Sequence, residues 1–279
     1  MTIHKETLVF VGGGRITSAL CAGLRLGGFH GDLVVYDRNP AKLRALQKES
    51  RVGCAYDLNS AVRRAGILIV AVRPASVAGI LKEIAATEVA ARVGVSLAAG
   101  IPLSLLSQHL RRVRWVRAMP SPVCRIGRGL TALSFDRSVS RAERTRVRNV
   151  FAMVGQVLEV PERGFDAFTA AYSSTHGYHA LATLAAAAQD AGLARKTALS
   201  AAAHALADGI EYWRESGLSV DELLQEAVTP GGIAAATMLA ADKAGYARAV
   251  RKGIEAGIRQ AQRNARSADA SSHRRVNTR

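Results

Sequence analysis

The sequence predicts an α/β protein in which an N-terminal, doubly wound parallel sheet is followed by an all-helical domain. Three observations carry this prediction. An apolar run at residues 8–11 leads directly into three consecutive glycines. Short apolar runs then alternate with helical patterns as far as residue 135, which is typical of βαβ units. From about Gly164 onward the chain is rich in alanine, and its patterns are helical.

The stretch "LVFVGGGRITSAL" predicts a strand, a tight turn and a helix in that order. The spacing G-x-G-x-x-G is met at Gly12 and Gly14, whereas Thr17 stands where the third glycine would be. Such a turn lets the backbone approach a pyrophosphate and points the N–H groups of a helix N-terminus at it. The alternative is a tight strand-to-helix turn that binds nothing.

The remaining elements of the first domain follow from the same alternation. A strand at 33–36 turns through Asn39-Pro40 into a helix, and a helical segment at 58–66 precedes a buried strand that begins at residue 67 and is stopped by Pro74. Next come a helix at 77–85, strands at 92–100, 113–120 and 129–135, and a short helix at 103–110. Because parallel sheets of this kind bind ligands at the carboxyl ends of their strands, the glycine turn lies at the expected edge.

The change of pattern near residues 161–164 predicts a domain boundary. We expect a dinucleotide-binding domain at residues 1–163 and a helical domain at 164–266. The last segment, 267–279, is polar and basic, and we expect it to be a disordered tail.

Composition excludes several classes of protein. The chain has 279 residues, 49% of them hydrophobic, which suffices for a sizeable core. It shows no leader and no apolar run near the roughly 20 residues that span a bilayer, so we expect a soluble, cytoplasmic protein without membrane contact.

The net charge of +16 is dispersed along the chain, so we expect no nucleic-acid partner. Three cysteines without a C-x-x-C pair argue against a disulfide framework, and no metal site is expected.

Two neighbouring residues bear on the choice of cofactor. Asp37 ends the second strand, about 20 residues past the glycine turn, where an acidic side chain bonds the ribose 2′-hydroxyl and an arginine accommodates a 2′-phosphate. Arg38 follows immediately. Asp37 therefore favours NADH and Arg38 favours NADPH, so the sequence predicts either cofactor. The alternative role of Asp37 is to cap the next helix.

Other candidate contacts stand at the ends of later strands. They occur in the segments "AVRP" (71–74), "LAAG" (97–100) and "RAMPSP" (117–122). Pro74 would shape a loop across the cofactor, the small residues 98–100 would permit close approach of a nicotinamide ring or substrate, and Ser121 offers a hydroxyl. Each segment is alternatively a simple strand end.

The helical domain carries two polar segments. "AYSSTHGYHA" (171–180) gathers hydroxyls and imidazoles among alanines, so these groups either satisfy one another or face a wet cleft. The possible proton donors there are Tyr172, His176 and Tyr178. In "VTPGG" (228–232) the Gly-Gly amides would hold a carboxylate, or the segment is only a helix breaker. The chemistry expected is that of a bound cofactor.

Taken together, these motifs resemble the pyrroline-5-carboxylate reductases from the glycine turn to about residue 260. The resemblance rests on "VGGGRITSAL", "AVRP", "VSLAAGIPLSLL", "VRAMP", "GLTAL", "VGQVLEV", the Tyr178 segment and "TPGG", in family order. It implies a Rossmann domain, a helical dimerisation domain that forms homodimers or larger assemblies, and NADPH or NADH as cofactor. It also implies hydride transfer to the C=N carbon of a cyclic imine that bears a carboxylate.

The sequence departs from the family pattern at positions that are expected to contact the substrate. Ser121 replaces an asparagine, and Tyr172 and His176 replace a serine and a proline. Ile233 and Ala234 replace two threonines that hold the substrate in the family. Three interpretations therefore stay open: an imine reductase with an altered pocket, which we place first; an ordinary pyrroline-5-carboxylate reductase of proline biosynthesis; and a non-catalytic dinucleotide-binding regulator.

The candidate site residues are as follows. For catalysis they are Tyr172, His176 and Tyr178. For substrate binding they are Ser121, Ser173, Ser174, Thr175, Thr229, Gly231, Gly232, Ile233 and Ala234. For cofactor binding they are Gly12, Gly14, Arg15, Ile16, Asp37, Arg38, Ala71, Val72, Arg73, Pro74, Ala98, Ala99, Gly100, Met119 and Pro120.

Overall fold

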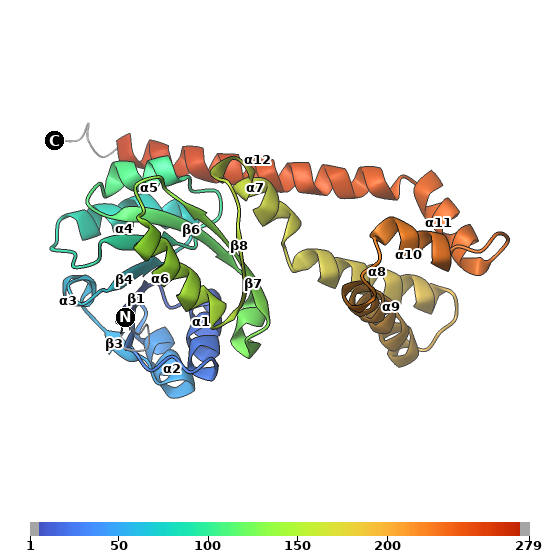
Figure 1. Ribbon diagram of the computed structural model, residues 1–279, viewed down its shortest axis with the longest axis horizontal. Helices are drawn as coiled ribbons and strands as arrows, with labels where there is room; N and C mark the ends of the chain where they lie inside the picture. Colours follow the sequence, from blue (N-terminus) through green and yellow to red (C-terminus); the bar gives the residue numbers. More distant parts are fainter. Residues whose placement is uncertain (1–5, 274–279) are drawn as a thin grey trace. The chain divides into compact units, whose positions relative to one another are not determined.

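The computed structural model describes residues 6–273, with side chains described as far as residue 270. The chain divides into two compact units (Figure 1). Unit 1 comprises Met1–Ala170 together with Ala256–Arg279, and unit 2 comprises Ala171–Glu255. Unit 1 thus extends beyond the predicted boundary at 163/164.

The sheet of unit 1 has the order β3-β2-β1-β4-β5-β6-β7-β8 within the described residues. Its strands are β1 (Leu8–Val11), β2 (Leu33–Tyr36), β3 (Gly53–Ala55), β4 (Ile67–Val70), β5 (Val93–Ser96), β6 (Arg114–Pro120), β7 (Gly129–Phe135) and β8 (Gly155–Glu159). Neighbouring strands are parallel except β6 and β7, which are antiparallel. The chain runs outward from β1 to β2 and β3 and then returns to the other side of β1 to form β4, so a topological switch point lies between β1 and β4.

Helices cover both faces of this sheet (Figure 1). They are α1 (Arg15–Leu26), α2 (Pro40–Ser50), α3 (Leu58–Val62), α4 (Val77–Ala85), α5 (Leu103–His109), α6 (Arg141–Ala152) and α7 (Glu162–Ala171), with short 3₁₀ turns η2 (Pro74–Ser76) and η3 (Pro122–Ile126). Alternate residues of β1 enter opposite cores: Leu8 and Phe10 pack on one side, Val9 and Val11 on the other. Every residue of β1 is therefore buried, which explains its unbroken apolar run.

The last helix returns the chain to unit 1. α12 (Tyr246–His273) contributes Ala261 and Ala268 to the buried residues, and the Asn264 side-chain amide donates to the carbonyl of Ala99 (3.3 Å). The prediction of a disordered segment from residue 267 is therefore wrong for residues 267–273, which are helical because Ala268 packs into the core. Residues 274–279 lie outside the described residues.

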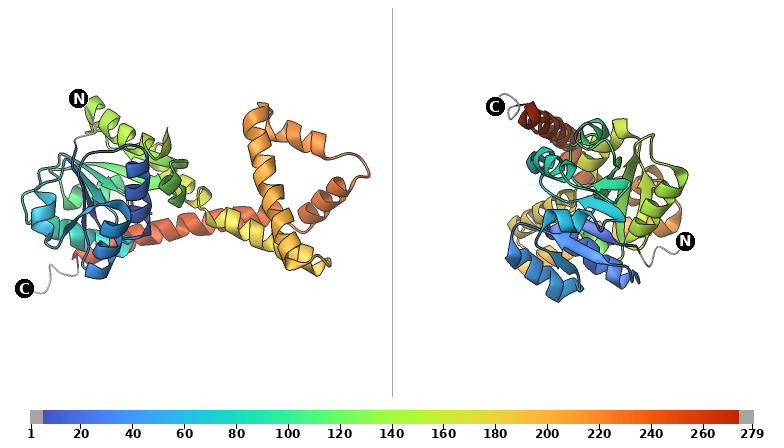
Figure 2. Two further views of the ribbon diagram at one scale, coloured as in Figure 1. Left: turned by 90° about the horizontal axis from the view of Figure 1, so that it is seen from below. Right: turned by 90° about the vertical axis from the view of Figure 1, so that its left-hand side faces the viewer.

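Unit 2 is entirely helical, as the sequence predicts. It contains α8 (Thr175–Asp190), α9 (Arg195–Ser216), α10 (Val220–Ala227), α11 (Ile233–Lys243) and the first part of α12 (Figure 2). α8 packs against α9. The buried residues of 171–255 are three alanines, Ala185, Ala198 and Ala202. Unit 2 of a single chain therefore has almost no core of its own.

No helix within residues 6–273 is both long and apolar enough to cross a membrane.

Candidate active site

The glycine turn joins the carboxyl ends of three strands. Gly12 N donates to the carbonyl of Tyr36 at the end of β2 (2.8 Å), and Ala71 N donates to the carbonyl of Val11 at the end of β1 (2.8 Å). Gly12 has φ +112°, and a Cβ there would lie 2.5 Å from the carbonyl oxygen of Ala71. Only glycine fits this position, because a side chain meets both a steric clash and an unfavourable backbone conformation.

Thr17 explains how the turn is held without a third glycine. Its side chain is fully buried, and its hydroxyl donates to the carbonyl of Gly12 (2.6 Å). α1 begins at Arg15 after an extended Gly14, and its first turn holds no acidic side chain. The first N–H groups of α1 are thus left for an anion, as a pyrophosphate site requires.

Asp37 supports the same turn from β2. Its Oδ2 accepts from Gly13 N (2.7 Å) and its Oδ1 accepts from Asn39 N (2.8 Å). Lys42 of α2 lies 3.5 Å from Oδ2. The side chain of Asp37 is only 13% exposed, so the carboxylate is fixed at the junction of the glycine turn and α2.

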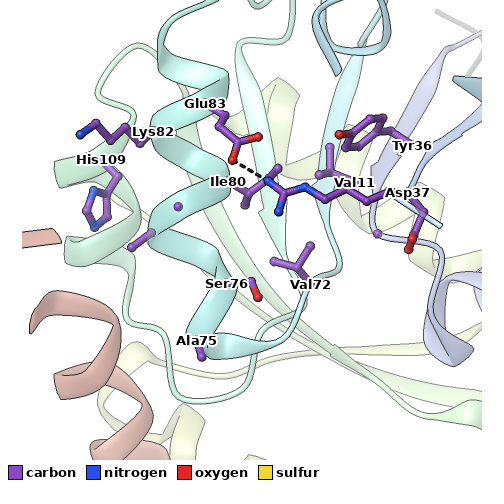
Figure 3. Close-up of a pocket in the computed structure, with 14 residues that line it drawn as sticks. Val11, Tyr36, Asp37, Val72, Ala75, Ser76, Ile80, Lys82, Glu83 and His109 are labelled. Atoms are coloured by element: carbon purple, nitrogen blue, oxygen red, sulfur yellow. Dashed lines mark hydrogen bonds and ion pairs between the residues drawn. The ribbon is translucent and has the colours of Figure 1, made fainter. Parts of the chain in front are cut away.

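A cavity of about 820 Å³ lies at this edge of the sheet, between the end of β2 and α4 (Figure 3). Of the predicted cofactor residues, Gly12, Asp37, Arg38 and Val72 line it. The other lining residues are Val11, Tyr36, Ala75, Ser76, Ala78, Gly79, Ile80, Lys82, Glu83 and His109. The lining residues from α4 were not predicted from the sequence, because they belong to no recognisable motif.

An ion pair reaches across this cavity. Nη2 of Arg38 lies 2.6 Å from Oε1 of Glu83 on α4, and both side chains are largely exposed (Figure 3). The carboxylate of Glu83, and after it Tyr36, raises the pKa of Arg38 further above its usual value. Arg38 therefore carries a permanent positive charge at the mouth of the cavity.

The other cofactor candidates from the loops after β1 and β4 are not among the residues that line the cavity. Gly14 is the N-cap of α1, Arg15 and Ile16 begin the helix, and Ala71 follows β4. Arg73 precedes η2, which Pro74 begins, so the proline shapes the loop between β4 and α4.

The small residues after β5 contact the last helix. Gly100 has φ +77°, and a Cβ there would lie 2.5 Å from the carbonyl oxygen of Ala261 in α12. Ala98 is buried, and the carbonyl of Ala99 accepts from Asn264. At Gly100, the close backbone approach is therefore to α12 of the same chain.

The end of β6 holds an unpaired polar group. Met119 and Pro120 pair with Ala132 and Thr131 of β7, which fixes the end of the strand. Ser121 follows; its side chain is 8% exposed, and its hydroxyl has no hydrogen-bond partner among the described residues. A buried unpaired hydroxyl is uncommon in proteins and is suited to a ligand contact.

Arg117 in the same strand has a structural role that its sequence context does not reveal. Its buried guanidinium bonds Glu162 (3.1 Å) and Asp166 (2.5 Å) of α7 and stacks over the ring of Phe165. Glu162 also accepts from Leu103 N at the start of α5 (3.0 Å). The arginine of "RAMP" therefore fastens α7 to the sheet.

The proton-donor candidates lie where α7 ends and α8 begins. Tyr172 is half-buried, whereas His176 and Tyr178 are exposed. The hydroxyls of Ser173 and Thr175 are 2.6 Å apart, and Ser174 precedes α8 without capping it through its side chain. Part of this cluster is therefore hydrogen-bonded internally.

The second polar segment of unit 2 forms the turn between α10 and α11. Gly232 N donates to the carbonyl of Thr229 (2.9 Å), and Gly231 has φ +77°. Ile233 is 89% exposed, and Ala234 beside it is exposed as well. Within unit 2 of one chain, this turn lies apart from the turn between α7 and α8 (Figure 1).

Among the described residues, no group of three or more His, Cys, Asp or Glu side chains is placed to hold a metal ion. Cys21, Cys54 and Cys124 are free, and burial raises the pKa of Cys21 to about 12 and that of Cys124 to about 11. These two thiols are therefore protonated and inert near neutral pH.

The strand order, the glycine turn and the cavity at the switch point place the protein in the class with a Rossmann-type dinucleotide-binding fold. Comparisons with known proteins narrow this class. A family model described as "NADP oxidoreductase coenzyme F420-dependent" matches residues 7–100, and one described as "Pyrroline-5-carboxylate reductase dimerisation" matches residues 162–264.

Two relatives carry the assignment to a family. The pyrroline-5-carboxylate reductase of Mycobacterium tuberculosis is 32% identical, over 92% of this chain and 96% of that protein. The enzyme of the same name from Thermus thermophilus is 34% identical, over 91% and 96%. The chain belongs to the pyrroline-5-carboxylate reductase family, and its cofactor is NAD(P)H.

Solved structures share the fold. The 1-pyrroline-5-carboxylate reductase from Streptococcus pyogenes superposes with a TM-score of 0.85 at 22% identity, covering 93% of this chain and 99% of that one. The Plasmodium falciparum pyrroline carboxylate reductase, whose structure has NADP bound, gives 0.81 at 21% identity, covering 93% and 98%.

Proposed function

We propose that this protein is a pyrroline-5-carboxylate reductase, which reduces a cyclic imine bearing a carboxylate to proline at the expense of NAD(P)H. The observation that carries the proposal is the similarity to enzymes of that name at 32% and 34% identity over more than nine tenths of the chain. It favours the ordinary reductase over the imine reductase with an altered pocket, which the sequence analysis places first.

The residues at the edge of the sheet fit a dinucleotide. Gly12 leaves the space that a side chain would fill, α1 offers its free N–H groups, and the cavity beside Asp37 and Arg38 suits an adenosine moiety. The other cofactor contacts that we propose are Gly14, Arg15, Ile16, Ala71, Val72, Arg73, Pro74, Ala98, Ala99, Gly100, Met119 and Pro120. The bound cofactor supplies a hydride, which forms the new C–H bond at the imine carbon.

The chain itself would orient the imine and supply a proton to its nitrogen. Ser121 is the proposed polar contact from unit 1, because its buried hydroxyl has no hydrogen-bond partner within the described part of the chain. We propose Tyr172, His176 and Tyr178 as the proton-donor candidates. The proposed substrate contacts of unit 2 are Ser173, Ser174, Thr175, Thr229, Gly231, Gly232, Ile233 and Ala234.

One observation keeps the altered-pocket interpretation as a second candidate. Ile233 and Ala234 have no hydrogen-bonding side-chain atoms, and Ile233 begins α11 almost fully exposed. A site that uses these residues would bind a less polar imine than one lined by hydroxyls.

The proposed working form is a homodimer through unit 2. This unit leaves large apolar side chains exposed, among them Tyr178 (66%), Ile210 (50%), Trp213 (45%) and Ile233 (89%), and buries only three alanines. An apolar surface of this extent is typical of an interface. The match of residues 162–264 to a dimerisation family supports the same assignment.

Rescue of a proline auxotroph tests the proposed function. We expect the wild-type gene to restore growth without proline, and Gly12→Val to abolish the rescue, because its side chain collides with the carbonyl of Ala71. Gly28→Val is the matched control, since Gly28 also has a positive φ but no atom within 4 Å of an added Cβ. Well-expressed wild-type protein that fails to rescue would contradict the proposal.

A further inference from the structure

Oppositely charged side chains line the cavity beside Gly12 in unit 1. Arg38 at the end of β2 bonds Glu83 of α4, while Asp37 is held by backbone amides and Lys42. Lys82 also lines the cavity from α4. Two basic side chains, Arg38 and Lys82, therefore line the cavity, and Arg38 is paired with Glu83 on the opposite side of the opening (Figure 3).

The ion pair between Arg38 and Glu83 affects NADPH and NADH differently. An arginine beside the ribose accommodates the 2′-phosphate of NADPH, while NADH presents only a 2′-hydroxyl there. To bind Arg38, a 2′-phosphate must displace Glu83 from the guanidinium and must also approach the negative charge of that carboxylate. A 2′-hydroxyl does not need to do either.

We propose that Glu83 is a specificity-determining residue, which occupies Arg38 across the nucleotide cavity and thereby disfavours a 2′-phosphorylated cofactor relative to an unphosphorylated one. The proposal rests on the nucleotide cavity assigned under the proposed function. The ion pair is exposed on both sides, with side-chain exposures of 70% and 47%, so it opens readily and discriminates without blocking the cavity.

Binding of nucleotide fragments tests this proposal without any turnover. Adenosine 2′,5′-bisphosphate and adenosine 5′-monophosphate are titrated calorimetrically into the full-length protein. We expect Glu83→Gln to tighten binding of the bisphosphate about five- to tenfold, because it frees Arg38 and removes a repulsive charge. Binding of the monophosphate should change less than about twofold, since its ribose carries no 2′-charge.

A double-mutant cycle separates occupation of Arg38 from simple repulsion. In an Arg38→Gln background, the gain from Glu83→Gln should shrink to about twofold or less, because no guanidinium remains to be released. Glu88→Gln is the control for net charge: Glu88 is exposed and lies 3.7 Å from Arg63, outside the cavity.

The outcomes distinguish the two proposals. An unchanged ratio of the two affinities in Glu83→Gln, or an equal gain in both backgrounds, would overturn the role of Glu83 while leaving the nucleotide site in place. Binding of neither fragment to the wild-type protein would overturn both the nucleotide site and the role of Glu83.

Discussion

At the scale of single residues, Asp37 has two tasks. Both carboxylate oxygens accept backbone N–H groups, from Gly13 and from Asn39, and the same residue lines the nucleotide cavity. Its position after β2 is the one from which an acidic side chain bonds a ribose hydroxyl. We therefore expect this carboxylate both to support the turn and to influence the choice of cofactor.

Asp37→Asn tests this double role. Loss of a negative charge should raise the affinity for adenosine 2′,5′-bisphosphate relative to the 5′-monophosphate by about threefold or more. The free energy of unfolding should fall by about 1 kcal/mol, because one buried acceptor is lost. Titration calorimetry and urea unfolding measure the two effects.

Asp32→Asn provides the control, since Asp32 is exposed and pairs only loosely with Arg64 at 3.8 Å. An unchanged affinity ratio in Asp37→Asn would place this carboxylate away from the ribose.

Some site residues were predictable from the sequence because they act within a local motif. Gly12 and Arg38 follow directly from the strand–turn–helix pattern and the end of the second strand. Glu83 was not predictable, because it meets Arg38 from 45 residues away and sits in an ordinary helix. Thr17 was noted only as a departure from the motif, and its bond to Gly12 becomes visible only in three dimensions.

At the scale of elements, α6 begins with a reinforced cap. The Ser140 hydroxyl and Glu143 form a capping box, and Glu143 also pairs with Arg114 of β6. Burial alone would raise the pKa of Glu143, but the hydrogen bonds from Ser140 and the charge of Arg114 outweigh it, so the pKa is lowered. This carboxylate therefore links the helix to the sheet in its ionised form.

Glu143→Gln should destabilise the fold in a pH-dependent manner. Because the folded-state pKa is lowered, the ionised carboxylate stabilises the protein above the unfolded-state pKa, and this contribution disappears as the pH falls through the folded-state value. We expect a loss of about 1–2 kcal/mol at pH 7 that vanishes in acid. Urea unfolding at a series of pH values measures it.

Glu222→Gln is the matched control. Glu222 forms the same capping box with Ser219 but is exposed and makes no ion pair with an arginine among the described contacts. Its effect should be smaller. A loss in Glu143→Gln that stayed constant from neutral to acid pH would refute the role of the charge.

The elements themselves were predictable to different degrees. The buried runs of β1, β2 and β4 contain few polar residues and were located from the sequence alone. α6 was not anticipated, because its arginine-rich sequence leaves only Val147, Val150 and Phe151 as buried apolar positions. The antiparallel pairing of β7 with β6 also carried no local signal, since strand direction depends on the connection through η3.

At the scale of the whole molecule, the two units differ in how they are stabilised. Unit 1 has a core on each face of its sheet, and α12 returns to it. Unit 2 buries three alanines and exposes one apolar face of α9, formed by Leu199, Ile210 and Trp213 at helical spacing. The proposed homodimer supplies the cover that this face lacks.

Ile210→Glu should disrupt that dimer. A charge placed within an apolar interface is costly, so we expect a shift from dimer to monomer in sedimentation experiments. Nucleotide fragments should bind as before, because the residues that line the cavity all belong to unit 1. Glu215→Lys, on another side of α9, should leave the dimer intact. A dimer that persisted in Ile210→Glu would exclude this face as the interface.

The proposed function is tested most directly by the rate at which the purified protein oxidises NADPH and NADH with pyrroline-5-carboxylate. The same rates are measured with cyclic imines that lack a carboxylate. A pyrroline-5-carboxylate reductase should show its highest kcat/KM of the panel with pyrroline-5-carboxylate. Tight cofactor binding with turnover confined to other imines would contradict the proposed function and would favour the imine reductase with an altered pocket.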